Sequence, residues 1–567
     1  MKKTIKKALV LFTLRQKKAL IIISFLLLVG MLLEVIGLGI LMPTITLILD
    51  TEASKNSLIL LKVRNLIPSI SDQNFKYLFL FAVSILYFVK FIYLSFLTFK
   101  QNRFLQNLTA YFSNKLYENY LHQDYNFHLI RNTSELLKNI QTEINLFSSF
   151  VSASLSIFIE IGFITSVILT LLNIEFFGAI TLAVFYSMLS LIFFTITRSK
   201  VKKWGEIRFQ IDNKLTKTLL EGLGAIKDLM ILGKTNFYAK EYSTTNYQKA
   251  RLISNQETVN NISRFYLEFI SVSGIIFFLL ILISQEKNNI ELVGVLGVFV
   301  ASSFRIIPSF NRIINSVQII RFSIPSVETI SKEMNRVDSE RKLNFKDGEF
   351  KFKEKIEINN LEFNYSDENK ILKDINLTIK KGQIVGIIGE SGSGKSTLID
   401  NILGLQKPTK GEIKIDGKTG FQLNQSWRRI IGYVSQSIYL TDDTIKNNIA
   451  LGVPNDEILE SRIFDILKDV QLEGFIKKLK FGIHTKVGER GVQLSGGQIQ
   501  RLGIARALYN SPDILILDEA TSALDSQTEK ELMECIYNLK GNKTILMIAH
   551  RINTLKKCDF LYEVKSN

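Results

Sequence analysis

The sequence predicts a two-part membrane protein, in which an all-α domain of six transmembrane helices precedes a soluble α/β domain. Three observations support this prediction. Long apolar segments fill the N-terminal part, short β-rich runs alternate with helical patterns from residue 356, and a glycine-rich loop follows one of those runs. A chain of 567 residues is too long for one hydrophobic core. We therefore expect a transmembrane domain at 1–330, a linker at 331–355 and a second domain at 356–567.

Six apolar segments account for the transmembrane prediction. They are residues 20–41, 77–99, 147–172, 176–196, 265–284 and a shorter one at 293–307. A bilayer-spanning helix needs roughly 20 apolar residues, and the first segment meets this length with Glu34 as its one charged residue. The apolar part of a cleaved signal peptide is shorter, so we interpret the first segment as a retained span.

The positions of the basic residues predict the orientation of these spans. Lys and Arg number seven in 1–18, five in 100–146 and twelve in 198–261, against four in 51–76, none in 173–175 and one in 285–291. Basic connections stay in the cytoplasm, which places the N-terminus and the second domain there. The net charge of +17 then reflects membrane topology, and we expect no nucleic-acid partner. Two cysteines build neither a disulfide framework nor a four-ligand zinc site.

Residues 389–396 fit the phosphate-binding pattern G-x-x-x-x-G-K-[ST]. An apolar run at 384–388 precedes them and a helical pattern follows, which is the strand–loop–helix context that the motif requires. Backbone N–H groups and the helix N-terminus favour phosphate binding, with Lys395 on the outer phosphates and Ser396 on Mg²⁺. The alternative is a glycine-rich turn with a chance lysine. The predicted ATP-binding residues here are Gly389, Glu390, Ser391, Gly392, Ser393, Gly394, Lys395, Ser396 and Thr397.

A second apolar run, 514–517, ends in Asp518 and Glu519. An acid at the end of such a strand can hold Mg²⁺, and the next acid can activate the attacking water. We assign Asp518 to the metal and Glu519 to general-base catalysis. Without the phosphate-binding loop upstream, a solvated acidic turn would be an equally good interpretation.

The sequence Leu494-Ser495-Gly496-Gly497-Gln498 lies between these two features and resembles the signature of ABC ATPases. Further motifs of that family follow the same order, and the resemblance covers residues 356–560. It implies ATP and Mg²⁺ as cofactors and ATP hydrolysis as the activity. The matching positions are Tyr365 for adenine stacking, Gln436 for metal and water, 487–491 (VGERG), 522–525 (SALD), and His550 for the γ-phosphate.

The family resemblance also implies a homodimer. In ABC ATPases the signature, here Ser495, Gly496, Gly497 and Gln498, faces the nucleotide of a partner subunit. Six spans followed by one such domain resemble a half-size ABC exporter. The two long cytoplasmic segments would be its intracellular loops, with short transverse helices near 125–132 and 219–227. An ordinary loop is the alternative at both places.

Charged residues inside the spans bear on the substrate. They are Glu34, Lys90, Glu160, Glu268 and Arg305, with Arg264 at the start of the fifth span. Intramembrane charges are costly and are candidates for function. The basic residues Lys90, Arg264 and Arg305 would suit an anionic headgroup in a cavity. Snorkelling or pairing within the membrane is the alternative.

Three membrane stretches, ILMPTITLILD, SRFYLEF and FRIIPSFNRIINS, resemble the PglK type of lipid-linked oligosaccharide flippase of bacterial protein N-glycosylation. This resemblance implies flipping of a polyprenyl-pyrophosphate glycan across the bacterial cytoplasmic (inner) membrane. It also implies that residues 57–66 form an amphipathic external helix. Alternatives are an exporter of lipid A, another glycolipid, a peptide or a drug. A non-transporting ABC ATPase is disfavoured by the six spans.

Overall fold

The computed structural model describes residues 2–49, 58–66, 71–174, 176–284, 289–340, 350–366, 369–419, 426–521, 525–549 and 555–565. These residues form two compact units. The first comprises 1–123 and 131–342, and the second comprises 124–130 and 343–567. We describe each unit by itself.

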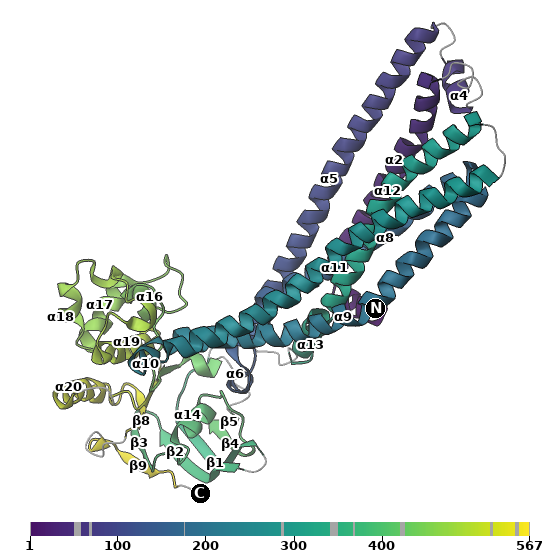
Figure 1. Ribbon diagram of the computed structural model, residues 1–567. Coiled ribbons are helices and arrows are strands. Elements are labelled where there is room, and N and C mark those ends of the chain that lie inside the picture. Colours follow the sequence, from purple (N-terminus) through teal and green to yellow (C-terminus); the bar gives the residue numbers. More distant parts are fainter. Residues whose placement is uncertain are drawn as a thin grey trace. The chain divides into compact units, whose positions relative to one another are not determined.

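All regular secondary structure among the described residues of the first unit is helical (Figure 1). Each of the six predicted spans falls within one long helix. The helices are α1 (Lys2–Val10), α2 (Leu14–Leu49), α4 (Leu58–Leu66), α5 (Asp72–Leu121), α7 (Thr133–Lys138), the π-helix η1 (Asn139–Glu143), α8 (Ile144–Ile174), α9 (Phe176–Gly224), α10 (Ile226–Ile231), α11 (Thr235–Ser284), α12 (Asn289–Phe322) and α13 (Ile324–Glu340). Within the described residues, Leu14–Gly37, Asp72–Leu121 and Thr133–Leu169 are long and apolar enough to cross a membrane.

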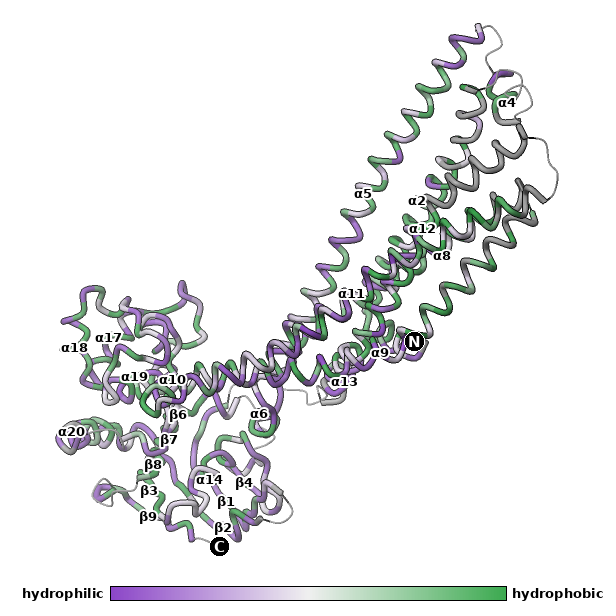
Figure 2. The backbone as a smooth tube through the Cα atoms, viewed as in Figure 1, coloured by the Kyte–Doolittle hydropathy of each residue, from purple (hydrophilic) through white to green (hydrophobic). Residues whose placement is uncertain are grey.

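Helix α12 is central to the packing of this unit, because it contacts α8, α9 and α11, while α2 packs against α5 and α8. Side chains such as Phe163, Leu267 and Ile270 are buried between these helices. Gly205 allows α9 to approach the end of α12, since a Cβ there would lie 2.6 Å from the carbonyl oxygen of Phe322. Figure 2 shows apolar residues along the described spans and hydrophilic residues where α9 and α11 extend beyond their spans.

The helix predicted at 57–66 is present as α4. Its Leu60 is buried against Leu47 of α2 and Phe75 and Phe79 of α5. Arg64 forms an ion pair with Asp72 at 2.5 Å and lies 5.0 Å from the centroid of the Phe75 ring. Helix α4 is therefore held by the ends of two long helices.

A short helix is present at each of the two predicted places, with shifted bounds. Helix α6 spans Tyr125–Ile130, and α10 spans Ile226–Ile231 rather than 219–227. The predicted break beside Gly222 and Gly224 is present, because α9 ends at Gly224 and the non-helical Ala225 separates it from α10. A further turn follows at Gly233, whose φ of +63° lies in the left-handed region that suits glycine.

Part of the predicted linker is helical. Helix α13 continues to Glu340, and its Val327, Ile330 and Met334 are buried at helical spacing. The charged composition of residues 331–340 suggested a linker. The apolar side chains buried at helical spacing show instead that this stretch continues a packed helix.

The second unit is an α/β domain with two sheets. Strands β1 (Lys355–Ser366), β2 (Asn369–Lys380), β4 (Lys410–Ile415) and β5 (Lys418–Thr419) form an antiparallel sheet in the order β2-β1-β4-β5. Strands β3 (Ile384–Ile388), β6 (Ile431–Val434), β7 (Ile514–Asp518), β8 (Thr544–Ile548) and β9 (Phe560–Glu563) form a parallel sheet in the order β6-β7-β8-β3-β9. The helical segments are α6, α14 (Lys395–Ile402), α16 (Ile445–Ile449), α17 (Glu460–Asp469), α18 (Glu473–Lys478), η2 (Gly482–His484), η3 (Glu489–Gly491), α19 (Gly496–Tyr509) and α20 (Ser526–Tyr537).

The parallel sheet is buried on both faces, which explains its continuous apolar strands. Alternate residues of β7 belong to different cores. Leu515 and Leu517 join a cluster that includes residues of α17 and α19, whereas Ile514 and Ile516 join a cluster with α14 and the antiparallel sheet. Because both faces of the sheet are buried, the strands are held in place, and so are the carboxyl ends that carry the candidate site.

Candidate ATP-binding site

The candidate site lies at the carboxyl edge of the parallel sheet. The phosphate-binding loop follows β3, Gln436 follows β6, and Asp518 and Glu519 end β7. Because β6, β7, β8 and β3 are neighbours in that order, these segments meet at one edge. The carboxyl ends of parallel strands are where α/β domains bind their ligands.

The phosphate-binding loop has the backbone geometry of an anion cradle. Gly389, Gly392 and Gly394 have φ values of 151°, 84° and 94°, and helix α14 begins directly after them at Lys395. Lys395 is 6% exposed, and its ammonium donates to the carbonyl oxygens of Gly389 and Glu390 at 3.0 and 2.8 Å. The loop therefore places a buried cation beside a helix N-terminus.

Two observations fit a bound phosphate. The Ser393 hydroxyl is buried and has no hydrogen-bond partner within the described residues, so it is available to a ligand. A Cβ added at Gly389 would lie 2.7 Å from that hydroxyl and 2.5 Å from the carbonyl oxygen of Val564. The loop thus needs glycine at this position to stay close to the strand ends, and it fits the phosphates of ATP.

A cluster of acids beside the loop fits a divalent cation. The Ser396 hydroxyl donates to Asp518 Oδ1 at 3.3 Å, and Asp518 is 4% exposed. Burial raises the pKa of Asp518, with a further contribution from the charge of Glu519. Burial and the charge of Asp518 raise the pKa of Asp400 to about 6. A Mg²⁺ ion held by Ser396 and Asp518 would compensate this negative charge.

Glu519 is held by both its backbone and its side chain. Its φ of +51° is uncommon for a residue with a Cβ. Its N–H donates to the carbonyl of Ile548 at 3.1 Å, and its carboxylate accepts from the Gln436 amide at 2.6 Å. Strained backbone geometry of this kind is often found at functional sites. The arrangement joins the end of β7 to the segment after β6, next to Ser396 and Asp518.

The remaining sequence-predicted residues are placed as follows. Tyr365 on β1 is 47% exposed and meets the Phe363 ring edge-on at 5.0 Å, which leaves a ring face accessible. Ser495 caps α19 in a reciprocal box with Gln498, so Gly496 and Gly497 start that helix. His550 and residues 522–524 lie outside the described residues.

Helix α6 brings a tyrosine near this site that the sequence analysis did not identify. Burial raises the pKa of Tyr125, with smaller contributions from the charges of Asp400 and Tyr365. Tyr433 on β6 was also missed, and it forms a side-chain hydrogen bond with Asp518. The position of Tyr433, three residues before Gln436, could have indicated that it lies near the site. No sequence motif indicated the same for Tyr125.

In the first unit, charged residues of different membrane helices form ion pairs with one another. Lys90 lies 3.6 Å from Glu34. Glu160 forms a two-pronged ion pair with Arg312, a residue that the sequence analysis placed beyond the sixth span and did not consider. Arg264 and Glu268 are exposed on α11. The side chain of Arg305 lies outside the described residues.

Comparisons with known proteins agree with this geometry. Residues 372–522 match the family model of the ABC transporter ATPase domain. The solved structure of a bacterial Atm1-family ABC exporter with ATP bound superposes with a TM-score of 0.77 at 22% identity, covering 97% of this chain and 95% of that one. The fold is therefore that of an ABC exporter.

Among curated relatives, an ATP-dependent lipid A-core flippase of Syntrophus aciditrophicus is 29% identical over 80% of this chain and 75% of its own length. A candidate multidrug export ATP-binding/permease protein of Staphylococcus aureus is 45% identical over 37% of each chain. The heterocyst differentiation ATP-binding protein HepA of Nostoc is 39% identical over 45% of this chain and 42% of its own length. These matches and the site geometry lead to one conclusion: the chain has the architecture of a membrane-spanning ABC exporter half-transporter, whose C-terminal ABC ATPase domain binds and hydrolyses ATP with Mg²⁺.

Proposed function

We propose that this chain is one subunit of a homodimeric flippase that uses ATP hydrolysis to move a lipid-linked oligosaccharide across the bacterial cytoplasmic membrane. The observation that carries the proposal is the presence of paired charges within the membrane helices of an ABC exporter. Lys90 is held by Glu34 at 3.6 Å, and neutral drug-like substrates would not require such costly groups. A polyprenyl-pyrophosphate headgroup is an anion that basic residues in a cavity would recognise.

The proposal assigns roles within the ATPase site. Lys395 and the loop glycines hold the phosphates, Ser396, Asp518 and Gln436 hold Mg²⁺, and Glu519 accepts a proton from the attacking water. The hydrogen bond from Gln436 to Glu519 supports this pairing of metal and base. His550 and the stacking of Tyr365 on adenine are assigned by the family resemblance.

Helix α10 supports the homodimer. Its neighbourhood exposes a patch of apolar side chains at the tip of the second cytoplasmic extension: Leu223, Met230, Ile231, Leu232 and Phe237, each between 62% and 73% exposed. This extension is polar along much of its length, so the tip is not a lipid-facing surface. An apolar patch of this kind fits a protein partner, and we propose the ATPase domain of a second copy. The N-terminus and the ATPase domain would lie in the cytoplasm, as the basic connections predict.

A second candidate substrate is lipid A or another glycolipid, because one relative is named a lipid A-core flippase. Its phosphate groups present the same chemistry to the basic residues. A peptide or drug exporter is the remaining candidate, supported by the shorter match to a multidrug exporter.

A flipping assay separates these candidates. The protein is reconstituted in liposomes, and ATP-dependent movement is measured for a polyprenyl-pyrophosphate glycan, for lipid A and for a peptide. We expect movement of the glycan, and we expect the combined variant Lys90→Ala, Arg264→Ala, Arg305→Ala to lose it while keeping much of its ATPase activity. Selective movement of lipid A or the peptide would refute the proposed substrate.

A further inference from the structure

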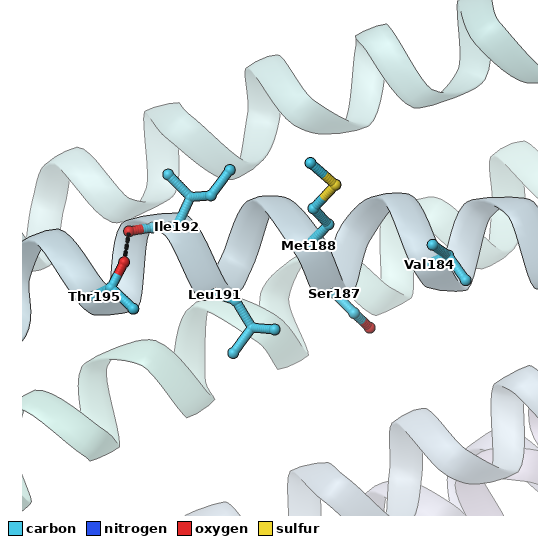
Figure 3. A pocket seen from close by; sticks show the side chains of 6 residues that line it. All are labelled: Val184, Ser187, Met188, Leu191, Ile192 and Thr195. Atoms are coloured by element: carbon cyan, nitrogen blue, oxygen red, sulfur yellow. Dashed lines mark hydrogen bonds between the residues drawn. The ribbon is translucent and has the colours of Figure 1, made fainter.

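Hollows in the described part of the first unit differ in their suitability for a polar ligand, and two of them show the contrast. Among the described residues, a hollow of about 600 Å³ is lined by six side chains of α9: Val184, Ser187, Met188, Leu191, Ile192 and Thr195 (Figure 3). The Thr195 hydroxyl already donates to the carbonyl of Ile192 at 2.9 Å. A smaller cavity of about 90 Å³ lies between α2, α5, α8 and α12, and Glu34, Glu160 and Arg312 line it. Only this second hollow combines charged groups from facing helices.

Arg312 is held in this cavity by Glu160. Its Nε lies 2.5 Å from Glu160 Oε1, and its Nη2 donates to Oε2 at 3.2 Å. Nη2 also donates to the Ser309 hydroxyl at 3.4 Å. The two parallel contacts fix the plane of the guanidinium, which a single contact would not do.

The orientation of this pair leaves the cation accessible. The side chain of Glu160 is 9% exposed, whereas that of Arg312 is 53% exposed. The carboxylate therefore lies beneath the guanidinium, and an approaching ligand meets the positive group first. Glu160 and Ser309 together engage both N–H groups of Nη2, so the N–H groups of Nη1 are the ones that can donate to a second oxyanion.

A second cation lies beside the same cavity. Glu34, which lines it, forms the ion pair with Lys90, and the Lys90 ammonium lies 5.1 Å from the centroid of the Tyr87 ring. The Tyr87 hydroxyl donates to the Gly37 carbonyl at 3.0 Å, which fixes that ring against α2. The α2–α5 contact thus holds Lys90 as the α8–α12 contact holds Arg312.

Both ion pairs, Glu34–Lys90 and Glu160–Arg312, lie near the middle of the predicted membrane spans. Glu34, Lys90 and Glu160 each fall near the middle of a predicted span. Because Arg312 contacts Glu160, its guanidinium lies at that depth as well. The cavity is much smaller than the roughly 300–1,000 Å³ of a typical ligand pocket, so it suits a phosphate-sized part of a substrate rather than a glycan.

We propose that Arg312, acting with Lys90, contacts the phosphate or pyrophosphate group of the lipid substrate, and that Glu160 and Glu34 are positioning residues for these two cations. The inference rests on the proposed function and adds a residue to it. The exposed edge of Arg312 binds the anion, while the buried carboxylates compensate both cations when no substrate is present. Without them, two unpaired charges would remain in the membrane.

The test measures how the ATPase rate of the full-length protein in lipid nanodiscs depends on ligand concentration, relative to each protein's basal rate. The ligands are farnesyl pyrophosphate, farnesyl phosphate, farnesol and inorganic pyrophosphate. We expect farnesyl pyrophosphate to stimulate the wild type and farnesol to have no effect. Inorganic pyrophosphate separates recognition of a lipid headgroup from recognition of a free anion.

Arg312→Lys and Arg312→Ala should raise the half-maximal concentration of farnesyl pyrophosphate about tenfold or more, because the fixed fork is lost. Arg251→Ala, which removes an exposed arginine on α11, is the matched control and should leave it unchanged. The double variant Glu160→Arg, Arg312→Glu keeps an ion pair but moves the guanidinium to α8.

The double variant decides between a binding role and a structural role for Arg312. A binding role predicts that it stays impaired although it folds. Full recovery in this variant would show that the pair only stabilises the helices and would overturn the inference. An unchanged response in Arg312→Ala would also overturn it. If the wild type responds to neither farnesyl pyrophosphate nor farnesyl phosphate, the proposed function fails, and the inference fails with it.

Discussion

The side-chain amide of Gln436 donates a hydrogen bond to the carboxylate of Glu519 across 2.6 Å. The two residues are 83 positions apart and follow neighbouring strands of the parallel sheet. The positive φ of Glu519 turns its carboxylate out of the strand direction. A residue proposed to sense the metal and a residue proposed to activate water are thus in direct contact, so a change at one is transmitted to the other.

Replacing Glu519 tests its assignment as general base. Glu519→Gln keeps the shape of the side chain and an acceptor for Gln436 but cannot take up a proton. We expect ATP binding to persist and kcat for hydrolysis to fall by a factor on the order of 10²–10⁴, as is typical for loss of a general base. Glu534→Gln, on an exposed face of α20, is the control. Near-normal ATP turnover in Glu519→Gln would refute the assignment of Glu519 as the general base.

The pKa of Asp400 gives a pH-dependent prediction. Burial and the charge of Asp518 raise this pKa to about 6, so ionisation of Asp400 destabilises the folded state. The penalty is absent below about pH 4, grows as pH rises through the folded pKa, and is complete above about pH 7. After allowance for solvent screening of this half-buried group, it amounts to about 1–2 kcal/mol.

Asp400→Asn removes that penalty. We expect it to raise the melting temperature of the nucleotide-free protein by a few degrees at pH 7.5 and to have no effect near pH 4. Asp442→Asn, at an exposed position of the same domain, should show no such pH-dependent gain. Thermal melts across this pH range provide the measurement, and stabilisation that is independent of pH would contradict the proposed cause.

A buried charge cluster joins helices of the first unit outside the predicted spans. Glu143 in the π-helix is fully buried and accepts hydrogen bonds from Ser326 at 2.5 Å and from Arg208 at 3.3 and 3.4 Å. Lys138 lies 3.5 Å from the same carboxylate and 3.3 Å from the centroid of the Phe209 ring. The cluster connects η1, α9 and α13.

Glu143→Ala should therefore be strongly destabilising. It leaves Lys138 and Arg208 buried without this carboxylate, which costs about 3–5 kcal/mol. Glu221→Ala is the matched control, because Glu221 forms an exposed pair with Lys217 at 3.6 Å, a type of contact worth less than about 1 kcal/mol. The yield and melting temperature of detergent-purified protein report the difference. Equal stability of the two variants would show that the cluster contributes little.

The apolar tip around α10 predicts an effect on coupling. Ile231→Asp places a charge on a side chain that is 73% exposed, so the subunit should fold normally. If the tip binds a partner's ATPase domain, ATP hydrolysis and flipping should both fall about tenfold or more, with lower dimer content by cross-linking. Tyr247→Asp, at a side chain 69% exposed on α11, should preserve both activities. Unchanged flipping in Ile231→Asp would argue against docking through this patch.

Much of the ATPase site was predictable because its parts are local. Gly389–Ser396 and the strand that precedes it are contiguous in the sequence, and a buried parallel strand is apolar throughout whichever sheet it joins. The placement of Asp518 beside Ser396 also follows from a general rule, since both come at the carboxyl ends of parallel strands. Tyr125 could not be placed near this site, because its six-residue helix carries no motif.

By itself, the sequence determined that this protein has long membrane helices joined by basic connections, and an ATPase domain with its phosphate-binding loop and strand-end acids. These features depend on composition, periodicity and short motifs. The tertiary structure alone decided which intramembrane charges meet. Glu160 and Arg312 are 152 residues apart, and Arg312 lies beyond the range that hydropathy assigns to the sixth span. Hydropathy records that a charge is costly in the membrane, whereas its partner depends on how the helices pack around it.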